Sequence, residues 1–299
     1  MRQALRWAGS IASLGLALAL LDWPSLADST QKLTPGMFVA SVLLACLPSL
    51  PLVARWHALT AADSGWYGSS ARYLYANLLN SVSPGNIGGD VYRFFAFRTA
   101  ERNGAALVAL LVRERLLGLA SMLTGLLAGA LAMQVMSVHP QQWLVRSMAL
   151  GAAAGLAALM LLSPIVERVP VPEPWRAHLR AALAIRTPAR DAALLGWSLA
   201  ALALWLVAVH FVATRLGLEI PWAVLLVVVT TVELVRVIPV TIQGIGLREA
   251  AFATSCGAFG YAHETGFVVG AVAYLALSVA LVATGALGAL MLALKAPPP

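Results

Sequence analysis

The sequence has little charge. Only 11% of its 299 residues are Asp, Glu, Lys or Arg, whereas 60% are hydrophobic and the mean hydropathy is +0.82. A soluble domain usually carries about 25% charged residues, and a globular core cannot bury this much apolar surface. The shortage of charge therefore argues against a soluble enzyme, a nucleic-acid-binding protein and a disordered chain. It predicts an all-α, polytopic integral membrane protein.

The sequence is also short of residues for covalent, metal or nucleotide chemistry. Cys46 and Cys256 lie in separate apolar stretches, with neither a CxxC motif nor a histidine cluster beside them. The sequence contains no Walker A pattern, and none of its five histidines lies in the motifs discussed below. We expect no disulfide framework, no metal, no cofactor and no ATP-driven pumping by this chain.

Long apolar runs dominate what is present, and a transmembrane helix needs about 20 such residues. Shorter apolar stretches at residues 221–235 and 247–259 flank one of two interrupted segments. We expect about six full spans, at residues 4–21, 36–53, 104–136, 143–165, 191–214 and 265–294.

The first apolar run has a second interpretation as a signal peptide. Arg2 and Arg6 flank its start, and Ser25-Leu26-Ala27 follows it as a small-residue cleavage site. We favour a retained span, because a chain with so many spans needs no cleavable leader.

The net charge of +7 comes from basic residues in the short connections between apolar runs. They group at three places: Arg2 and Arg6; Arg55, Arg98 and Arg102; and residues 168–190. By the positive-inside rule these groups and the N-terminus are cytoplasmic. We expect a multi-pass protein of the bacterial cytoplasmic (inner) membrane. The connection 168–190 is too short for a soluble domain, and we expect a surface helix in it.

We expect a single transmembrane domain over residues 1–299, with halves at residues 1–138 and 143–295. Each half reads as two spans, an interrupted segment and a long span. Three full crossings per half would invert one half relative to the other, as in transporters that place broken helices at the midplane. Any polytopic chain can be cut into similar halves, so chance similarity is the alternative.

The first interrupted segment covers residues 77–93 and combines a proline with glycines that end helices. Asp90 is placed to cap a following helix, and Arg93 adds a positive charge one turn later. A re-entrant hairpin whose helix ends surround a phosphate-sized group explains the pattern, and so does a cytoplasmic loop with a capped helix. The candidate substrate-binding residues here are Asn80, Pro84, Gly88, Gly89, Asp90 and Arg93.

The second interrupted segment covers residues 237–252 and lies in apolar surroundings. Non-helical backbone at membrane depth survives only where protein or a water-filled cavity satisfies it. The glycine pattern at residues 244–246 is not a nucleotide fingerprint, because no βαβ unit surrounds it. The candidate substrate-binding residues here are Glu233, Arg236, Gly244, Gly246, Arg248 and Glu249.

A third charged element, Arg113-Glu114-Arg115, lies about ten residues into the apolar run at 104–136. Ionisable groups at that depth cost several kcal/mol unless they pair or face water. Glu114 neutralises only part of two arginines, so these three candidate substrate-binding residues offer a surplus for a phosphate. The alternative is a helix that starts near Arg115, with the charges at the cytoplasmic interface.

These elements occur in a recognisable order along the chain: Asn80…Pro84-Gly85-x-Ile87-Gly88-Gly89-Asp90-Val91-x-Arg93, then Arg113-Glu114-Arg115-x-x-Gly118, then Pro239…Gly244-Ile245-Gly246-x-Arg248-Glu249. The order resembles the lysylphosphatidylglycerol synthase transmembrane-region family, the flippase-like domain of multiple peptide resistance factor and its stand-alone relatives. The resemblance covers residues 4–294, nearly the whole chain.

The resemblance implies a domain that moves lipid between leaflets. Full-length members make aminoacylated lipid in a soluble C-terminal domain, and we expect no such synthase domain here. Thr241-Ile242-Gln243 stands where the family more often has a Pro-Gly-Gly-like run. That departure leaves the lipid open, because stand-alone relatives are linked to glycolipid, polyprenyl-phosphate or hopanoid pathways.

The leading hypothesis is therefore a transporter rather than an enzyme: a flippase-like translocase for an anionic phospholipid, glycolipid or lipid-linked precursor, with the two breaks meeting near the midplane. An intramembrane transferase with Asp90 or Glu249 as base is a second hypothesis, and a non-catalytic membrane scaffold is a third. The expected partner is a membrane lipid with an anionic headgroup. A second copy of the chain and a separate lipid-synthesising enzyme are further candidates, and no nucleic-acid partner is expected.

Overall fold

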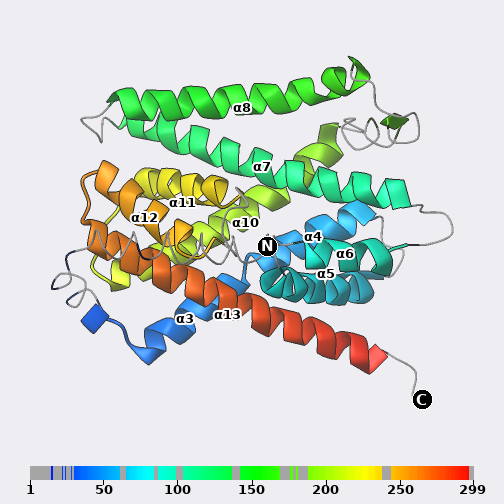
Figure 1. Ribbon diagram of the computed structural model, residues 1–299, viewed down its shortest axis with the longest axis horizontal. Coiled ribbons are helices and arrows are strands. Elements are labelled where there is room, and N and C mark those ends of the chain that lie inside the picture. Colours follow the sequence, from blue (N-terminus) through cyan, green and yellow to red (C-terminus); the bar gives the residue numbers. More distant parts are fainter. Residues whose placement is uncertain are drawn as a thin grey trace.

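The protein is helical throughout the part that the structure describes, with no strand in that part (Figure 1). This computed structural model describes residues 30–60, 65–83, 87–98, 104–136, 142–168, 188–237 and 244–295, with isolated positions between them. The helices are α3 Pro35–Cys46, α4 Ser49–Thr60, α5 Gly65–Val82, α6 Gly88–Ala96, α7 Gly104–Val135, α8 Gln142–Arg168, α10 Pro188–Arg215, α11 Trp222–Arg236, α12 Leu247–Ala258 and α13 His263–Lys295.

Several of these helices are long and apolar enough to cross a membrane. The candidate spans among the described residues are Pro35–Thr60, Gly104–Val135, Gln142–Leu162, Ala189–Arg215 and His263–Leu294. They confirm the prediction of an all-α polytopic membrane protein, and four of them match predicted spans closely. The predicted span at residues 4–21 and most of the predicted surface helix at 168–190 lie outside the described residues.

The span predicted at residues 36–53 is longer than expected. It consists of α3 and α4, separated only by a turn at Leu47 and Pro48, and it continues to Thr60. The prediction ended it before Arg55 because a charge usually marks the end of a span. Arg55 is instead buried, with its guanidinium paired inside the protein.

Two helical hairpins lie between the long helices. We call α5–α6 the first hairpin and α11–α12 the second hairpin. The second hairpin has arms of 15 and 12 residues, or about 22 and 18 Å, which are shorter than the roughly 30 Å hydrocarbon core of a bilayer. In Figure 1 the first hairpin lies in the right half and the second in the left half, and α7 and α13 contact both.

Close packing against glycines joins both hairpins to α13. A Cβ at Gly285 would lie 2.3 Å from the Cβ of Leu78 on α5, and one at Gly270 would lie 2.9 Å from the Cβ of Phe252 on α12. Small residues let helices in a membrane approach this closely. The long helix α13 therefore packs closely against both hairpins.

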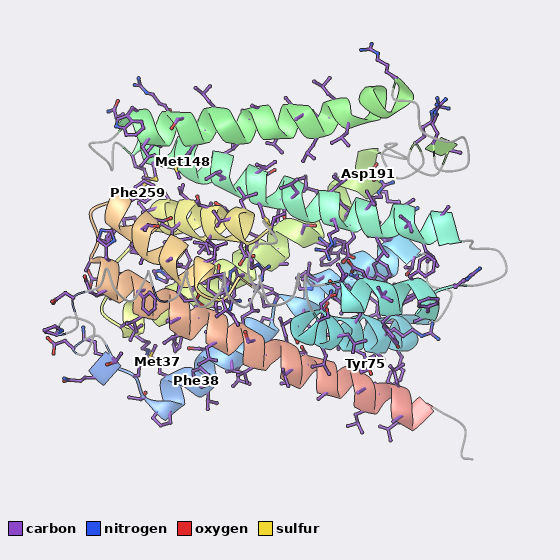
Figure 2. All side chains as sticks on the ribbon, viewed as in Figure 1. Met37, Phe38, Tyr75, Met148, Asp191 and Phe259 are labelled. Atoms are coloured by element: carbon purple, nitrogen blue, oxygen red, sulfur yellow. The ribbon has the colours of Figure 1, made fainter. Side chains whose placement is uncertain are left out.

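The apolar core is shared among the helices around the second hairpin. Valines of α11 form its centre, with Val224, Val228, Val229 and Val232 all fully buried. Met37 and Phe38 of α3 join it from one end, where Figure 2 labels them. A smaller apolar cluster around Trp56, Tyr73 and Phe97 underlies the first hairpin. Each hairpin is thus supported by its own packed region.

Candidate functional site

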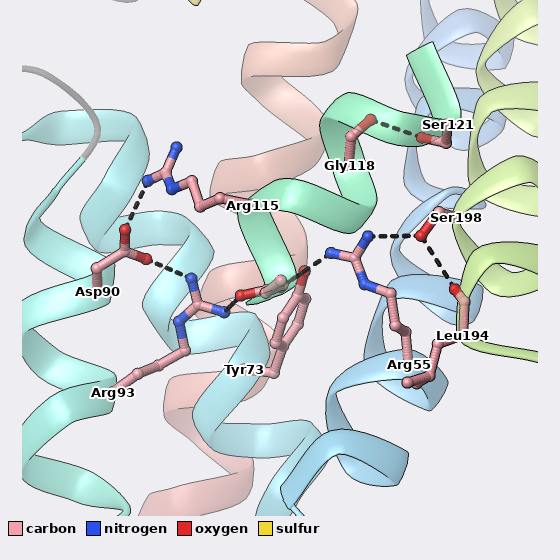
Figure 3. Close-up of polar contacts among 10 residues, drawn as sticks. Arg55, Tyr73, Asp90, Arg93, Arg115, Gly118, Ser121, Leu194 and Ser198 are labelled. Carbon is pink, nitrogen blue, oxygen red and sulfur yellow. Dashed lines mark hydrogen bonds and ion pairs between the residues drawn. The ribbon is translucent and has the colours of Figure 1, made fainter. Parts of the chain in front are cut away.

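The carboxylate of Glu114 is the centre of a buried ionic network, which we call the first charge cluster. Arg55 Nη2 donates to Glu114 Oε1 at 3.0 Å, and Arg93 Nη1 donates to Oε2. The hydroxyl of Tyr73 also donates to Oε1, at 3.3 Å. The network draws on α4, α5, α6 and α7, and Figure 3 shows the two guanidinium groups converging beside the tyrosine.

Asp90 extends the cluster toward the surface. It pairs with Arg93 Nη2 on its own helix and with Arg115 Nη2 on α7, the latter at 2.6 Å. The side chain of Arg115 is 56% exposed, whereas that of Arg93 is 5% exposed. Arg115 is therefore the outer end of a chain of ion pairs whose inner end is fully enclosed.

Arg113 and Arg115, which the sequence left without partners beyond Glu114, each pair with a carboxylate from another helix. Arg113 pairs with Asp191, which lies on α10 beside α7 (Figure 2), and Arg115 pairs with Asp90. Four arginines, namely 55, 93, 113 and 115, thus meet three carboxylates, at positions 90, 114 and 191. The excess of one positive charge is the same as in the Arg113-Glu114-Arg115 triplet alone, but it is shared by the whole cluster.

These charges lie well inside a helix. Because α7 begins at Gly104, Glu114 is about 15 Å from the helix start, at 1.5 Å per residue. The alternative that this helix starts near Arg115 is therefore wrong. The charges lie within the helix and are held inside the protein by pairing.

The first turn of α6 is capped by α5, not by Asp90 as predicted. Gly89 N–H donates to Asn80 Oδ1 and Gly88 N–H donates to Ser83 Oγ, each at 2.8 Å. Asp90 is the third residue of α6, so its carboxylate points to the arginines instead. Since acceptors of the chain occupy these two N–H groups, they are not free for a phosphate. Pro84 lies outside the described residues.

The close approach of the two arms explains the paired glycines. A Cβ at Gly89 would lie 2.0 Å from the carbonyl oxygen of Ala76, and one at Gly88 would lie 2.7 Å from Ser83 Cβ. No larger residue fits between the arms at these positions. Gly88 and Gly89 are therefore packing residues that bring Asp90 and Arg93 to Glu114.

Three members of the first charge cluster were not among the predicted binding residues: Arg55, Tyr73 and Ser198. Arg55 Nη1 donates to Ser198 Oγ at 2.8 Å, which ties the cluster to α10. Trp56 and Tyr73 also line Arg93, with ring centres 4.6 and 5.3 Å from its guanidinium carbon. The sequence shows only that Arg55 directly follows a long apolar run, a position that an arginine at the end of a span also has.

The second charge cluster consists of Glu233, Arg236, Arg248, Glu249 and Tyr274. Tyr274 on α13 donates to Glu233 Oε1 at 3.0 Å, and Arg236 Nη2 pairs with Glu233 Oε2 at 2.7 Å. Arg248 is stacked over the ring of Tyr274, 4.6 Å from the ring centre. The structure thus brings the four predicted charged residues of the second segment together around a tyrosine that was not predicted.

Two glycines shape the start of α12. Gly244 and Gly246 have φ of 76° and 82°, a conformation that favours glycine. Glu249 Oε2 accepts a hydrogen bond of 2.7 Å from Gly246 N–H, which fixes the first turn. Glu249, a predicted binding residue, therefore caps the start of α12.

The two clusters are built on separate hairpins. The tips of the hairpins, residues 84–86 and 238–243, lie outside the described residues. Their meeting near the midplane therefore stays a prediction, as does the inverted repeat of the two halves.

A comparison with protein-family models gives one match. The model for the lysylphosphatidylglycerol synthase TM region matches residues 4–288, which include both hairpins and both charge clusters. The chain belongs to this family. No curated protein and no solved structure was found to match it. This family describes a membrane domain that occurs in lipid-related proteins. In this member, the two hairpins carry the buried charge clusters.

Proposed function

We propose that this protein is a flippase-like lipid translocase, which moves an anionic phospholipid, glycolipid or lipid-linked precursor between the leaflets of a bacterial cytoplasmic membrane. The observation that carries the proposal is the presence of buried arginine–carboxylate clusters on two membrane hairpins. A protein that only spans or organises a membrane has no need of them. An arginine or aspartate at the centre of a span costs about 2.5–3.5 kcal/mol, and such residues usually mark the route of a substrate or ion.

The chemistry of the clusters suits an anionic headgroup. A guanidinium presents a planar fork of donors that matches a phosphate, and each cluster contains arginines held at carboxylates. A phosphate that approaches Arg115 or Arg236, the more exposed arginines with 56% and 27% exposed side chains, can replace the carboxylate partner there. The headgroup would exchange ion pairs in steps, while its acyl chains stay in lipid.

The direction of the chain follows from charge. The connection after α8 and the segment between α6 and α7 carry arginines, so the positive-inside rule assigns them and the N-terminus to the cytoplasm. The first charge cluster would then face the cytoplasmic leaflet and the second the outer leaflet. We propose transport that is downhill or ion-coupled, without enzymatic conversion of the lipid. A separate enzyme would supply the lipid.

Transport by purified protein in vesicles tests this function. Vesicles of phosphatidylcholine with a trace of fluorescent phosphatidylglycerol are treated with dithionite, which bleaches only outer-leaflet label. The protein is expected to increase the bleached fraction beyond the half that protein-free vesicles lose. Fluorescent phosphatidylcholine should cross more slowly than the anionic lipid.

A matched pair of variants separates transport from leakage. Arg115→Gln should slow transport of the anionic lipid, whereas Arg146→Gln, an exposed arginine that bonds Gln142 at the start of α8, should not. Equal bleaching in vesicles with and without protein would refute the proposal. Chemical conversion of the lipid by the purified protein would favour the transferase instead. Full activity of Arg115→Gln in cells would favour the non-catalytic scaffold.

A further inference from the structure

Each charge cluster contains an arginine, a tyrosine and a glutamate. The tyrosine and the glutamate have exchanged places between the two clusters. Each hairpin places an arginine on its second arm, Arg93 on α6 and Arg248 on α12. In the first cluster the tyrosine is on the first arm and the glutamate on the following long helix, as Tyr73 and Glu114. In the second cluster the glutamate is on the first arm and the tyrosine on the long helix.

The correspondence extends to position. Glu114 lies ten residues after the start of α7, and Tyr274 lies eleven residues after the start of α13. Each tyrosine donates to the glutamate of its own cluster, and both pairs are 41 positions apart in the sequence. The two clusters are therefore comparable, and the residue on the long helix is the difference that decides their electrostatics.

This exchange leaves the two arginines in different states. Arg93 gives its terminal nitrogens to two carboxylates, Glu114 and Asp90. Arg248 has the face of the Tyr274 ring beneath it instead of a carboxylate at its edge. An aromatic face attracts a cation but accepts no in-plane hydrogen bond. The fork of Arg248 therefore lacks the anion that Glu114 provides for Arg93.

The remaining contacts of Arg248 do not replace that anion. Within the described residues its only ion pair is with Glu249 Oε1 at 3.7 Å, beyond hydrogen-bond distance. Its buried Nε has no acceptor, as is also true of Arg55 and Arg93 in the first charge cluster. The other oxygen of Glu249 is held by Gly246 N–H. The side chain of Arg248 is 5% exposed, so water does not provide the missing acceptors readily.

The surroundings of Arg248 favour an anion. A Cβ at Gly244 would lie 2.9 Å from Arg248 Cγ and 3.0 Å from Arg236 Cγ, so the stems of two arginines converge on this glycine. The N-terminus of the twelve-residue α12 adds the positive end of its dipole at the same place. Two arginines and the helix N-terminus thus face the two carboxylates of the cluster, Glu233 and Glu249, so that the helix dipole tips the balance toward an anion.

We infer that Arg248, supported by Arg236, binds the phosphate group of an anionic lipid headgroup, and that the phosphate pairs with Arg248 as Glu114 pairs with Arg93 in the first charge cluster. The inference rests on the proposed function and names its first substrate contact. Within the part of the chain that the structure describes, no carboxylate lies within hydrogen-bond distance of Arg248, whereas Arg93 has two. The ligand is a lipid whose headgroup has a net negative charge, such as phosphatidylglycerol, because the same phosphodiester in phosphatidylcholine is neutralised by the choline cation.

Lipid retention by the purified protein tests the inference directly. The protein is kept in micelles that contain equal amounts of phosphatidylglycerol and phosphatidylcholine, and retained lipid is measured by native mass spectrometry. The wild-type protein should retain phosphatidylglycerol selectively. Equal retention of both lipids would overturn the inference without any variant, so the test does not depend on how well a variant folds.

Variants at position 274 provide the sharper test. Tyr274→Glu places a carboxylate where the first cluster has Glu114, and it should reduce phosphatidylglycerol retention by about tenfold, as Arg248→Gln should. Tyr274→Phe keeps the ring and should retain the lipid. Arg146→Gln removes an exposed charge and is the matched control. Undiminished retention by folded Tyr274→Glu would overturn the inference.

Competition with inorganic phosphate distinguishes the source of the ligand. Displacement of phosphatidylglycerol by excess inorganic phosphate would support a phosphate site at Arg248 that also takes the free ion. Resistance to displacement would assign the site to the lipid. Binding without transport in vesicles would refute the proposed function and leave the site intact. Transport that persists in Arg248→Gln would refute the site and leave the function intact.

Discussion

Tyr73 and Glu114 are 41 positions apart in sequence, and the tyrosine hydroxyl donates to the glutamate at 3.3 Å inside the first charge cluster. Glu114 also accepts from Arg55 and Arg93, so one carboxylate holds three helices against α7. A buried ion pair contributes little net stability, but the loss of one partner leaves an uncompensated charge. The relationship makes Glu114 the most sensitive position of this network.

Glu114→Gln is expected to destabilise the protein strongly. The amide leaves two buried arginines without their shared carboxylate, which costs about 3–5 kcal/mol when a buried pair is broken. Thermal unfolding in detergent, followed by tryptophan fluorescence, measures the effect. Glu219→Gln, at an exposed position after α10, is the control and should change stability by less than about 0.5 kcal/mol.

A double variant separates lost pairing from disturbed packing. Because the cost of Glu114→Gln comes from unpaired cations, Arg55→Met in the same protein should recover part of the loss. If the loss of unfolding free energy in the double variant equals the sum of the losses in the two single variants, the two residues are not coupled. That result would contradict the network described above.

Asn80→Ala is expected to loosen the start of α6. Asn80 accepts the Gly89 N–H, and the loss of such a cap costs about 1 kcal/mol. Hydrogen exchange at the first amides of α6 should accelerate, while exchange in α13 should not change. Asn77→Ala, one turn earlier on α5, is the matched control. Equal protection of α6 in both variants would show that the cap is not needed.

The fold was more predictable than the site, for a physical reason. Helices in a bilayer follow local apolarity, so α7, α8, α10 and α13 appear within a few residues of their predicted bounds. The breaks at residues 84–89 and 239–246 were visible because proline and glycine end helices wherever they occur. These signals require no knowledge of the neighbouring helices.

Pairing inside the membrane could not be read in the same way. Arg55 is 59 positions from Glu114, and nothing local distinguishes a buried arginine from one that marks the end of a span. Asp90 was predicted as a cap from its place before a helix, but Asn80 and Ser83 from the other arm perform that role. The correct partners follow only from how α5 and α6 pack together.

Gly285→Ala is expected to separate α13 from the first hairpin. The added Cβ would lie 2.3 Å from Leu78 Cβ, a clash that costs about 1–3 kcal/mol in a packed interface. Gly151→Ala is the control, since nothing lies within 4 Å of a Cβ at that position. Leu78→Ala combined with Gly285→Ala should recover part of the lost stability. Thermal unfolding is measured for the wild type, Gly285→Ala, Gly151→Ala and the double variant. The double variant would show no recovery if Gly285 and Leu78 are not in contact.

In the first charge cluster, the exposure of each arginine predicts which charge serves transport and which serves folding. Arg93 is enclosed between two carboxylates and two aromatic rings, so Arg93→Gln should unfold the protein at a much lower temperature. Arg115 is 56% exposed and shares Asp90 with Arg93, so Arg115→Gln should cost less than about 1 kcal/mol. The same variant should nevertheless slow transfer of anionic lipid, because it removes the outermost cation of the first charge cluster. Parallel measurement of unfolding temperature and vesicle transport decides the point. If Arg115→Gln unfolds early or transports at the wild-type rate, the outer ion pair is not the place where a headgroup exchanges with a carboxylate.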